Sequence, residues 1–432
     1  MSDEKFDAIV VGAGVAGSTA AYLLAREGLQ VVLVERGPYP GSKNLSGGVL
    51  YTRVLERIFP HYAEEAPLER CITNQVISFM TGDSTFSIDF KHAGFQQQPY
   101  NAFTVLRAKF DRWLAEKAEE AGAMLVPGIK VEQVLKDSGG RVVGVQAGDD
   151  ELLADVVIAA DGATSFLAQQ AGLRGRIPTK HIATGVKAVV GLPRAVIEDR
   201  FRLDGNEGVA YTTLGSATRG VAGGGFLYTN AESLSVGLVM RLDDLVRTKS
   251  RPAEIFDEYL AHPLIASLVK DGELLEYGAH VVPEGGLDML PQLSTAGMLV
   301  VGDAAGLVIN NGFAIRGMDL AIGSAVAAAQ AVMEARAAAD FSAQSLSRYK
   351  AILDRSFVMA DMRTYARAPH FLENPRLFKD YPELLASLMT RIYTQNATGK
   401  QPARAEARQT LKDSPVSLID LARDVLEGAR AL

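Results

Sequence analysis

Residues 6–17 read FDAIVVGAGVAG, an apolar, β-branched run that leads directly into a cluster of glycines. An Ala- and Leu-rich helical pattern follows to about Glu27, and Gly28 ends it. A second apolar run, residues 30–34, then ends at Glu35. Strand, helix and strand in this order predict a βαβ unit with two parallel strands at the start of the chain.

Three glycines of this stretch, Gly12, Gly14 and Gly17, form the pattern G-x-G-x-x-G. In a dinucleotide fold the first glycine makes a tight turn, the second lets the backbone approach a pyrophosphate, and the third lets helix and strand pack closely. The helix N-terminus favours the anion, and an acid at the end of the second strand accepts hydrogen bonds from a ribose. We therefore expect a dinucleotide site made by Gly12, Ala13, Gly14, Ala16, Gly17, Glu35 and Arg36.

Two later segments bear on whether the dinucleotide is a nicotinamide cofactor or FAD. Residues 156–165, VVIAADGATS, place Asp161 and Gly162 after a strand, and residues 298–306, MLVVGDAAG, do the same with Gly302 and Asp303. A carboxylate at a strand end, followed by a small-residue helix, suits a flavin ribityl chain and its pyrophosphate. A single Asp-Gly pair is more often an ordinary turn. The three segments together, in this order, favour FAD.

Composition excludes several classes of function. The formal net charge of −7 provides no basic excess for nucleic acid. The one cysteine, Cys71, cannot form an internal disulfide or a thiolate metal cluster within this chain, so the reducing cytoplasm is the expected compartment. No signal peptide is visible at the charged start, and the most apolar helical stretch, residues 320–333, is too short to span a membrane. Peripheral membrane contact stays open.

The length of 432 residues predicts more than one domain. We expect a discontinuous FAD-binding domain made by residues 1–75, 98–178 and 283–345. Residues 76–97 and 179–282, with alternating strands and glycine clusters, are expected to form an inserted β-rich domain for a quinone or another substrate. Residues 346–432 read as a helical C-terminal region.

These motifs resemble the large FAD family of the p-hydroxybenzoate-hydroxylase type. The glycine motif, Asp161-Gly162 and Gly302-Asp303 all match. The resemblance implies an α/β fold with a Rossmann-like FAD-binding domain of the p-hydroxybenzoate-hydroxylase/glutathione-reductase type. It also implies that the Arg107 side chain reaches the FAD pyrophosphate and that the backbone of Val131 meets the adenine.

Within that class, nearly the whole chain resembles the FixC subfamily of electron-transfer-flavoprotein:quinone oxidoreductases. The matching stretches include residues 40–51 (PGSKNLSGGVLY), 224–230, 279–284, 312–320 and 361–382. The resemblance implies electrons from a FixA/FixB-type flavoprotein, and transfer to a ferredoxin-like FixX partner and to quinone at the cytoplasmic face of the inner membrane. Supply of electrons for nitrogen fixation is a known role of the subfamily. The further FAD contacts implied are Lys43, Asn44, Ser46, Gly47, Gly48, Gly312, Gly317 and Met318.

Full-length quinone oxidoreductases carry an iron–sulfur domain, and with only Cys71 this chain departs from them. The departure fits a subunit whose cluster lies on a separate polypeptide. Three alternatives stay open: an aromatic-ring hydroxylase, a geranylgeranyl-type reductase, and a flavin relay subunit with little activity alone. No catalytic side chain and no metal site is expected, because the flavin carries the chemistry. His280 and Tyr228 are candidates for lining the flavin or quinone site.

Overall fold

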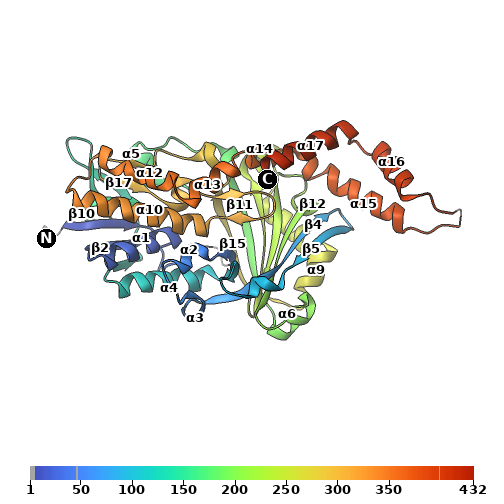
Figure 1. Ribbon diagram of the computed structural model, residues 1–432, viewed down its shortest axis with the longest axis horizontal. Coiled ribbons are helices and arrows are strands. Elements are labelled where there is room, and N and C mark those ends of the chain that lie inside the picture. The colour runs from blue at the N-terminus through green and yellow to red at the C-terminus, as the bar shows by residue number, and fades with distance from the viewer. Residues whose placement is uncertain (1–4, 45–46, 398) are drawn as a thin grey trace.

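The computed structural model describes residues 5–44, 47–397 and 399–432, and it divides into three parts (Figure 1). The first part is built on an eight-stranded sheet with the order β16-β17-β10-β1-β2-β7, extended by the hairpin β8–β9. Four of its pairings are parallel: β17 with β10, β10 with β1, β1 with β2, and β2 with β7. The strands are β1 (Lys5–Val11), β2 (Val31–Glu35), β7 (Met124–Pro127), β8 (Val131–Lys136), β9 (Val142–Ala147), β10 (Asp150–Ala159), β16 (Ser294–Thr295) and β17 (Met298–Val300).

Helices cover this sheet because its strands are apolar on both faces. Every residue of β2 is buried, as expected for a parallel strand between two helical layers. Helix α1 (Val15–Arg26) connects β1 to β2 and packs against α4 (Arg107–Glu120) and α10 (Met318–Ala337). The predicted βαβ unit is therefore present.

The second part is a nine-stranded sheet with the order β15-β11-β14-β13-β12-β4-β6-β3, and β5 pairs with β4. Its strands are β3 (Gly48–Tyr51), β4 (Leu68–Met80), β5 (Thr85–Lys91), β6 (Ala102–Val105), β11 (Ile182–Gly191), β12 (Glu207–Gly215), β13 (Gly223–Thr229), β14 (Ser233–Arg241) and β15 (Glu273–Pro283). This sheet starts earlier in the chain than the expected boundary at residue 76. β3, β6 and the first half of β4 belong to it because they pair with one another and β4 pairs with β12.

Shorter elements connect and cover the two sheets. They include α2 (Arg53–Glu56), α3 (Tyr62–Glu65), α5 (Phe166–Ala171), α6 (Arg194–Phe201), α7 (Leu242–Thr248), α8 (Pro252–Ala261), α9 (Pro263–Val269), and the two-stranded pair β18 (Ile309–Asn310) and β19 (Ile315–Arg316). Two large hydrophobic clusters result, one around the first sheet and one around the second.

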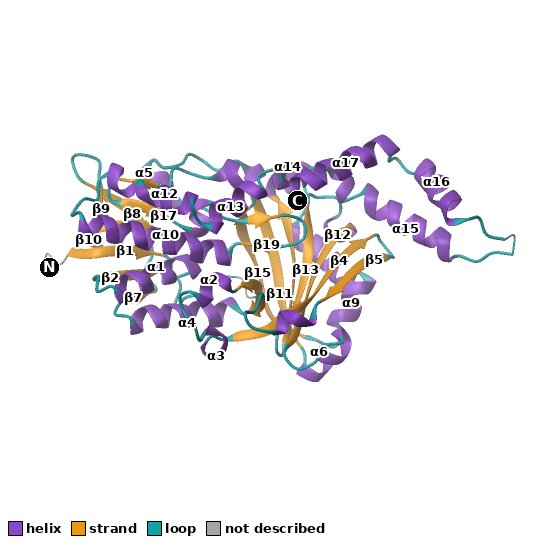
Figure 2. Cartoon of the chain, viewed as in Figure 1, coloured by secondary structure: helices purple, strands orange, loops and turns teal. Residues whose placement is uncertain are grey.

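The third part is helical, as predicted; its first helices pack against α10, and its later helices extend beyond the second sheet (Figure 2). It comprises α11 (Ala343–Leu346), α12 (Arg348–Asp354), α13 (Phe357–Thr364), α14 (Ala368–Phe371), α15 (Asp380–Tyr393), α16 (Ala403–Asp413) and α17 (Leu418–Ala431). Helix α15 leads away from β4 and β5, and α17 returns to contact α14.

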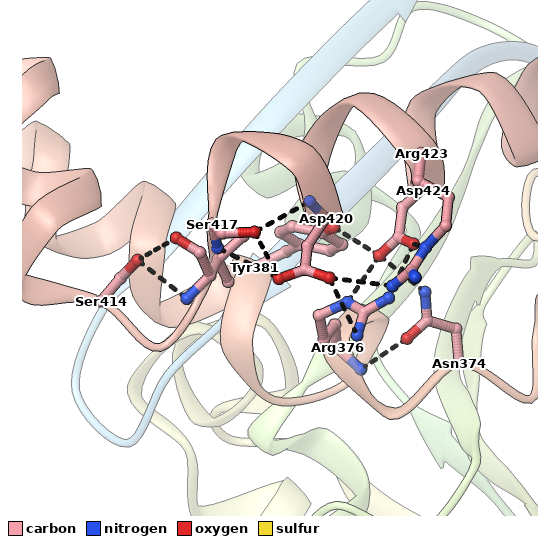
Figure 3. A network of polar contacts seen from close by, with 9 residues as sticks. Asn374, Arg376, Tyr381, Ser414, Ser417, Asp420, Arg423 and Asp424 are labelled. Carbon is pink, nitrogen blue, oxygen red and sulfur yellow. Dashed lines mark hydrogen bonds and ion pairs between the residues drawn. The ribbon is translucent and has the colours of Figure 1, made fainter.

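A buried carboxylate connects the returning helix α17 to the chain before α15 (Figure 3). Asp424 is 3% exposed and accepts hydrogen bonds from Asn374 (2.8 Å), Arg376 (2.6 and 2.7 Å) and the Tyr381 hydroxyl (2.6 Å). The Ser417 side chain caps α17 in a reciprocal capping box with Asp420. Within the described parts of the chain, no helix has the length and apolar character needed to cross a membrane.

Candidate functional site

A cavity of about 680 Å³ lies between the first sheet and the second, at the carboxyl ends of β1 and β10. Its volume is within the range of small-molecule and cofactor pockets. Most of the residues that the sequence places at the cofactor site line this cavity. They are Gly12, Gly14, Ala16, Glu35, Arg36, Lys43, Asn44, Gly47, Gly48, Arg107, Val131, Asp161, Gly162, Asp303, Gly317 and Met318. Four others, Ala13, Gly17, Gly302 and Gly312, lie outside its lining, and Ser46 falls outside the described residues.

The three motif glycines meet different neighbours. Gly12 has φ +101°, and a Cβ there would lie 2.4 Å from the Ala160 carbonyl oxygen. A Cβ on Gly17 would lie 1.9 Å from the Gly12 carbonyl oxygen. A Cβ on Gly14 meets no protein atom closer than the Arg107 Nη2, 3.9 Å away. Gly12 and Gly17 are therefore required by packing, whereas Gly14 leaves space only for what occupies the cavity.

Glu35 fixes the glycine loop as well as lining the cavity. Its Oε2 accepts a hydrogen bond from the Ala13 N–H (3.0 Å), and its Oε1 accepts one from the Gly37 N–H (2.6 Å). A carboxylate has about four acceptor positions, so two such bonds leave capacity for a ribose hydroxyl. Ala13 therefore reaches the site through its backbone.

Gly302 and Gly312 have local structural reasons to be glycine. Gly302 has φ +61°, donates its N–H to the Ser324 Oγ (3.0 Å), and would place a Cβ 2.8 Å from the Ala16 Cβ. The absence of a side chain thus lets β17 approach α1 and α10. Gly312 has φ +78° and lines a second, smaller cavity next to the first.

Arg107 is held against the cavity by a residue that the sequence analysis did not select. The guanidinium donates from Nε and Nη2 to the two oxygens of Asp111, at 2.7 and 2.8 Å, one helical turn along α4. Asn44 donates to the same carboxylate (2.6 Å), and Asp111 itself is fully buried. The i, i+4 spacing of Arg107 and Asp111 is the sequence signal that could have indicated this pair.

The two strand-end carboxylates, Asp161 and Asp303, both line the cavity. Asp161 accepts a hydrogen bond from the Leu167 N–H through Oδ2 (3.0 Å), whereas its Oδ1 is buried without a partner among the described residues. Burial raises the pKa of both Asp161 and Asp303, and for Asp303 the nearby Arg107 opposes the shift. An unpartnered buried acceptor at the cavity wall fits a ligand that carries hydroxyl groups, as the ribityl chain of FAD does.

The second sheet adds a cation to the cavity that the sequence analysis missed. Lys187, on β11, donates a hydrogen bond to the Gly47 carbonyl, and its Nζ lies 5.5 Å from the centre of the Phe226 ring. Burial and the nearby Arg107 lower the pKa of Lys187 to about 7. No ion-pair partner of Lys187 is found in the described part of the chain. In its protonated form this lysine suits a cofactor that becomes more negative on reduction.

The candidates His280 and Tyr228 also line this cavity, and Tyr228 lies at its boundary with the smaller one. Burial lowers the pKa of His280 and raises that of Tyr228, so both side chains are neutral at pH 7. The two cavities share Val49, Phe226, Tyr228, Val239, Glu284, Asn310 and Ile315. A molecule in the smaller cavity would therefore contact the same wall as the occupant of the larger one.

Three family models match the chain. A model described as "FAD binding domain" matches residues 5–224, and one described as "ETF-QO, ubiquinone-binding" matches residues 202–282. The "ETF-QO/FixC family C-terminal domain" matches residues 368–432, which contain α14 to α17. FAD is therefore the cofactor, as the sequence motifs predicted.

Curated relatives match over the full length. The chain is 48% identical over 432 residues to the probable electron transfer flavoprotein-quinone oxidoreductase YdiS of Escherichia coli K12, covering 100% of both chains. It is 47% identical to the protein FixC of Salmonella typhi, again over 100% of both. Identity to the protein FixC of Bradyrhizobium diazoefficiens is 40% over 405 residues, 93% of each chain.

Solved structures share the fold at low identity. A geranylgeranyl bacteriochlorophyll reductase-like protein from Thermoplasma acidophilum has a TM-score of 0.73 at 22% identity, over 98% of this chain and 99% of that one. The myxobacterial halogenase CndH has a TM-score of 0.61 at 19% identity, over 99% of this chain and 91% of that one. The predicted α/β fold is confirmed, and these similarities concern the fold alone. By its full-length relatives and its matching domains, this chain belongs to the family of electron-transfer-flavoprotein:quinone oxidoreductases and FixC proteins, and it is an FAD-dependent oxidoreductase.

Proposed function

We propose that this chain receives electrons from a reduced electron-transfer flavoprotein of the FixA/FixB type. It then passes them to a ferredoxin-like partner of the FixX type and to quinone. The observation that carries the proposal is the pair of adjoining cavities. The larger is lined by the dinucleotide motifs, and one wall of the smaller is made by residues 210–241, within the range that the ubiquinone-binding family model matches.

In this proposal FAD occupies the larger cavity. Arg107 and the loop around Gly14 face its pyrophosphate, Glu35 faces the ribose of its adenosine half, and Val131 meets the adenine. The two strand-end carboxylates face its ribityl chain. Around the flavin ring lie Lys43, Asn44, Gly47, Gly48, Gly317 and Met318. A flavin takes up two electrons and can release them one at a time, and the protein positions it, tunes it and keeps water away.

The quinone ring is proposed to reach the flavin through the smaller cavity. Phe226 and Tyr228 stack there with their ring centres 4.9 Å apart. The exposed apolar side chains Phe313 and Ile315 line the same cavity. A flat apolar wall and an apolar rim suit a ring that carries an isoprenoid tail.

The transfer to a FixX-type partner is supported by the lack of cysteines that could ligate an iron–sulfur cluster in this sequence. Cys71 is the single cysteine of the sequence; it is buried, and burial raises the pKa of its thiol to about 11. A protonated, isolated thiol cannot ligate an iron–sulfur cluster. We propose that the cluster lies on the partner, and that the pair works at the cytoplasmic face of the inner membrane through peripheral contact.

The choice of electron donor tests this function. The purified, FAD-loaded chain is mixed anaerobically with a soluble quinone and either a reduced electron-transfer flavoprotein or NADPH. The proposal predicts quinol formation with the flavoprotein and none above background with NADPH. NADPH oxidation that an aromatic compound stimulates, with consumption of oxygen in an aerobic control, would instead identify a hydroxylase. Adjacent genes for a two-subunit flavoprotein and a small cysteine-rich ferredoxin would support the proposed partners.

A further inference from the structure

Glu284 is an acid at the boundary between the two cavities, and the function proposed above assigns it no role. It follows the last residue of β15 and lines both cavities. Its backbone N–H donates to the His181 carbonyl (2.8 Å), and its Oε1 accepts a hydrogen bond from the Asn310 Nδ2 (3.2 Å). Its other oxygen, Oε2, is buried and has no hydrogen-bond partner among the described residues.

The backbone on either side holds this acid in place. A Cβ on Gly285 would lie 2.7 Å from the His181 Cγ, and a Cβ on Gly286, with φ +55°, would lie 3.0 Å from the Pro369 Cγ. The two glycines therefore let the chain turn tightly between neighbouring segments directly after Glu284. Glu284 therefore holds a carboxyl group with one unpartnered oxygen at the boundary between the two cavities.

The surroundings bring the pKa of Glu284 close to neutral pH, so a large fraction of it is protonated there. Burial, chiefly, raises its pKa to about 7, and Asp243 adds to the shift, while the Asn310 hydrogen bond and Arg241 oppose it. The other ionisable side chains that line the smaller cavity are Tyr51, Lys180, His181, Tyr228, Arg241, Asp288, His370 and Glu373.

Conversion of a quinone to a quinol takes two electrons and two protons. An acidic side chain at the cavity wall can supply these protons as a general acid. Burial raises the pKa of Tyr228 and of Tyr51, which makes both poor acids at pH 7, and burial lowers the pKa of His181. Glu284 is the described carboxyl group that lines both cavities and has a pKa close to the working pH.

We propose that Glu284 is the proton donor to the quinone. This inference rests on the proposed function. The Glu284 O–H bond breaks and an O–H bond forms on a quinone oxygen, while the two electrons come from the reduced electron-transfer flavoprotein by way of FAD. Glu284 regains a proton from solvent and gives the second proton to the other oxygen. Asp288 and His370 line the same smaller cavity, form a 3.1 Å pair and are each more than half exposed, and we assign the route to solvent to them.

The test compares Glu284→Gln with Glu284→Asp and Glu273→Gln in the FAD-loaded chain. Glutamine keeps the size of the side chain and an acceptor for Asn310 but carries no acidic proton, whereas aspartate keeps the proton. Glu273 is exposed at the start of β15 and lines neither cavity, so Glu273→Gln is the charge-matched control. Each variant is reduced with dithionite and mixed with a soluble quinone, or with ferricenium, which accepts electrons without protons.

The rate of quinol formation should fall at least about 100-fold in Glu284→Gln, the size of effect typical of a lost general acid. Oxidation by ferricenium should stay within about twofold of wild type. In wild type the quinone rate should fall as pH rises through about 7, because Glu284 loses its proton, and the variant should lose this dependence. Glu284→Asp should retain a measurable part of the rate.

A readout independent of turnover is the infrared band of a protonated carboxyl group. It should disappear from the wild-type spectrum as pH rises through about 7 and be absent from Glu284→Gln. A Glu284→Gln protein that reduces quinone at the wild-type rate with an unchanged pH profile overturns this inference and leaves the proposed function standing. A wild-type protein that reduces ferricenium but no quinone overturns both.

Discussion

Replacing Gly14 or Gly17 of the glycine loop with alanine should have different effects. At Gly14, which lines the cavity with φ −78°, an added Cβ meets no protein atom closer than 3.9 Å. At Gly17 the same Cβ would lie 1.9 Å from a backbone oxygen, that of Gly12. Gly14→Ala should therefore leave the fold intact and disturb the cofactor, whereas Gly17→Ala should disturb the fold itself.

The magnitudes follow from these contacts. Gly14 is the N-cap of α1, where alanine is less favourable than glycine by on the order of 0.5–1 kcal/mol. A side chain that pushes a phosphate away and breaks one charge-assisted hydrogen bond costs about 1.5–3 kcal/mol of binding, or roughly 10–150-fold in the FAD dissociation constant. The overlap in Gly17→Ala requires α1 to move from the loop, which costs about 3 kcal/mol or more.

Two measurements separate the outcomes: thermal unfolding of the FAD-free chain, and titration of that chain with FAD. Gly175→Ala is the matched control, since a Cβ there meets nothing within 4 Å. The larger Gly14→Val should retain no FAD through purification. If Gly14→Ala binds FAD as tightly as the Gly175 control, the assignment of the pyrophosphate to this loop is wrong. Unfolding of Gly14→Ala at the same lowered temperature as Gly17→Ala would also contradict the reasoning.

Further predictions concern the groups around the cavity and the C-terminal helix. Asp111→Asn removes the partner that orients Arg107, and we expect FAD titration to show about tenfold weaker binding. Lys187→Met removes a side chain that, when protonated, stabilises the reduced cofactor. Losing about 1.4–3 kcal/mol of that stabilisation should make the two-electron potential of FAD roughly 30–60 mV more negative. Equilibration with redox dyes measures this potential. Asp424→Asn should speed proteolysis of the chain after residue 398 at pH 7. Hydrogen bonds, first that from Arg376, hold the pKa of Asp424 below its usual range. The stabilisation that ionised Asp424 gives to the C-terminal helices is therefore present above about pH 4. The difference in proteolysis rate between Asp424→Asn and wild type should narrow as the pH falls below about 4.

Much of the cofactor cavity was predictable because its residues follow neighbouring parallel strands of one sheet. Gly12, Asp161 and Asp303 come after β1, β10 and β17, and those strands are adjacent and parallel. The carboxyl ends of such strands meet at one edge, so three separate motifs had to converge. The helical C-terminal region was predictable from its periodicity in the same local way.

The second sheet was less predictable because its pairings join distant segments. Lys187 reaches the cavity only because β11 lies between β14 and β15, and Glu284 only because β15 ends beside the turn that precedes β11. No local spacing in the sequence encodes that strand order. The early boundary of this sheet has the same cause: β4 pairs in parallel with β12, more than a hundred residues later.

The most direct test of the proposed function is an anaerobic absorbance titration of the FAD-loaded chain. Reduced electron-transfer flavoprotein is added first, and a soluble quinone second. We predict that the reduced flavoprotein reduces the FAD of this chain and that the quinone reoxidises it, with one quinol formed per FAD reduced. Bleaching by NADPH alone, followed by recovery with oxygen but not with quinone, would contradict the proposed function.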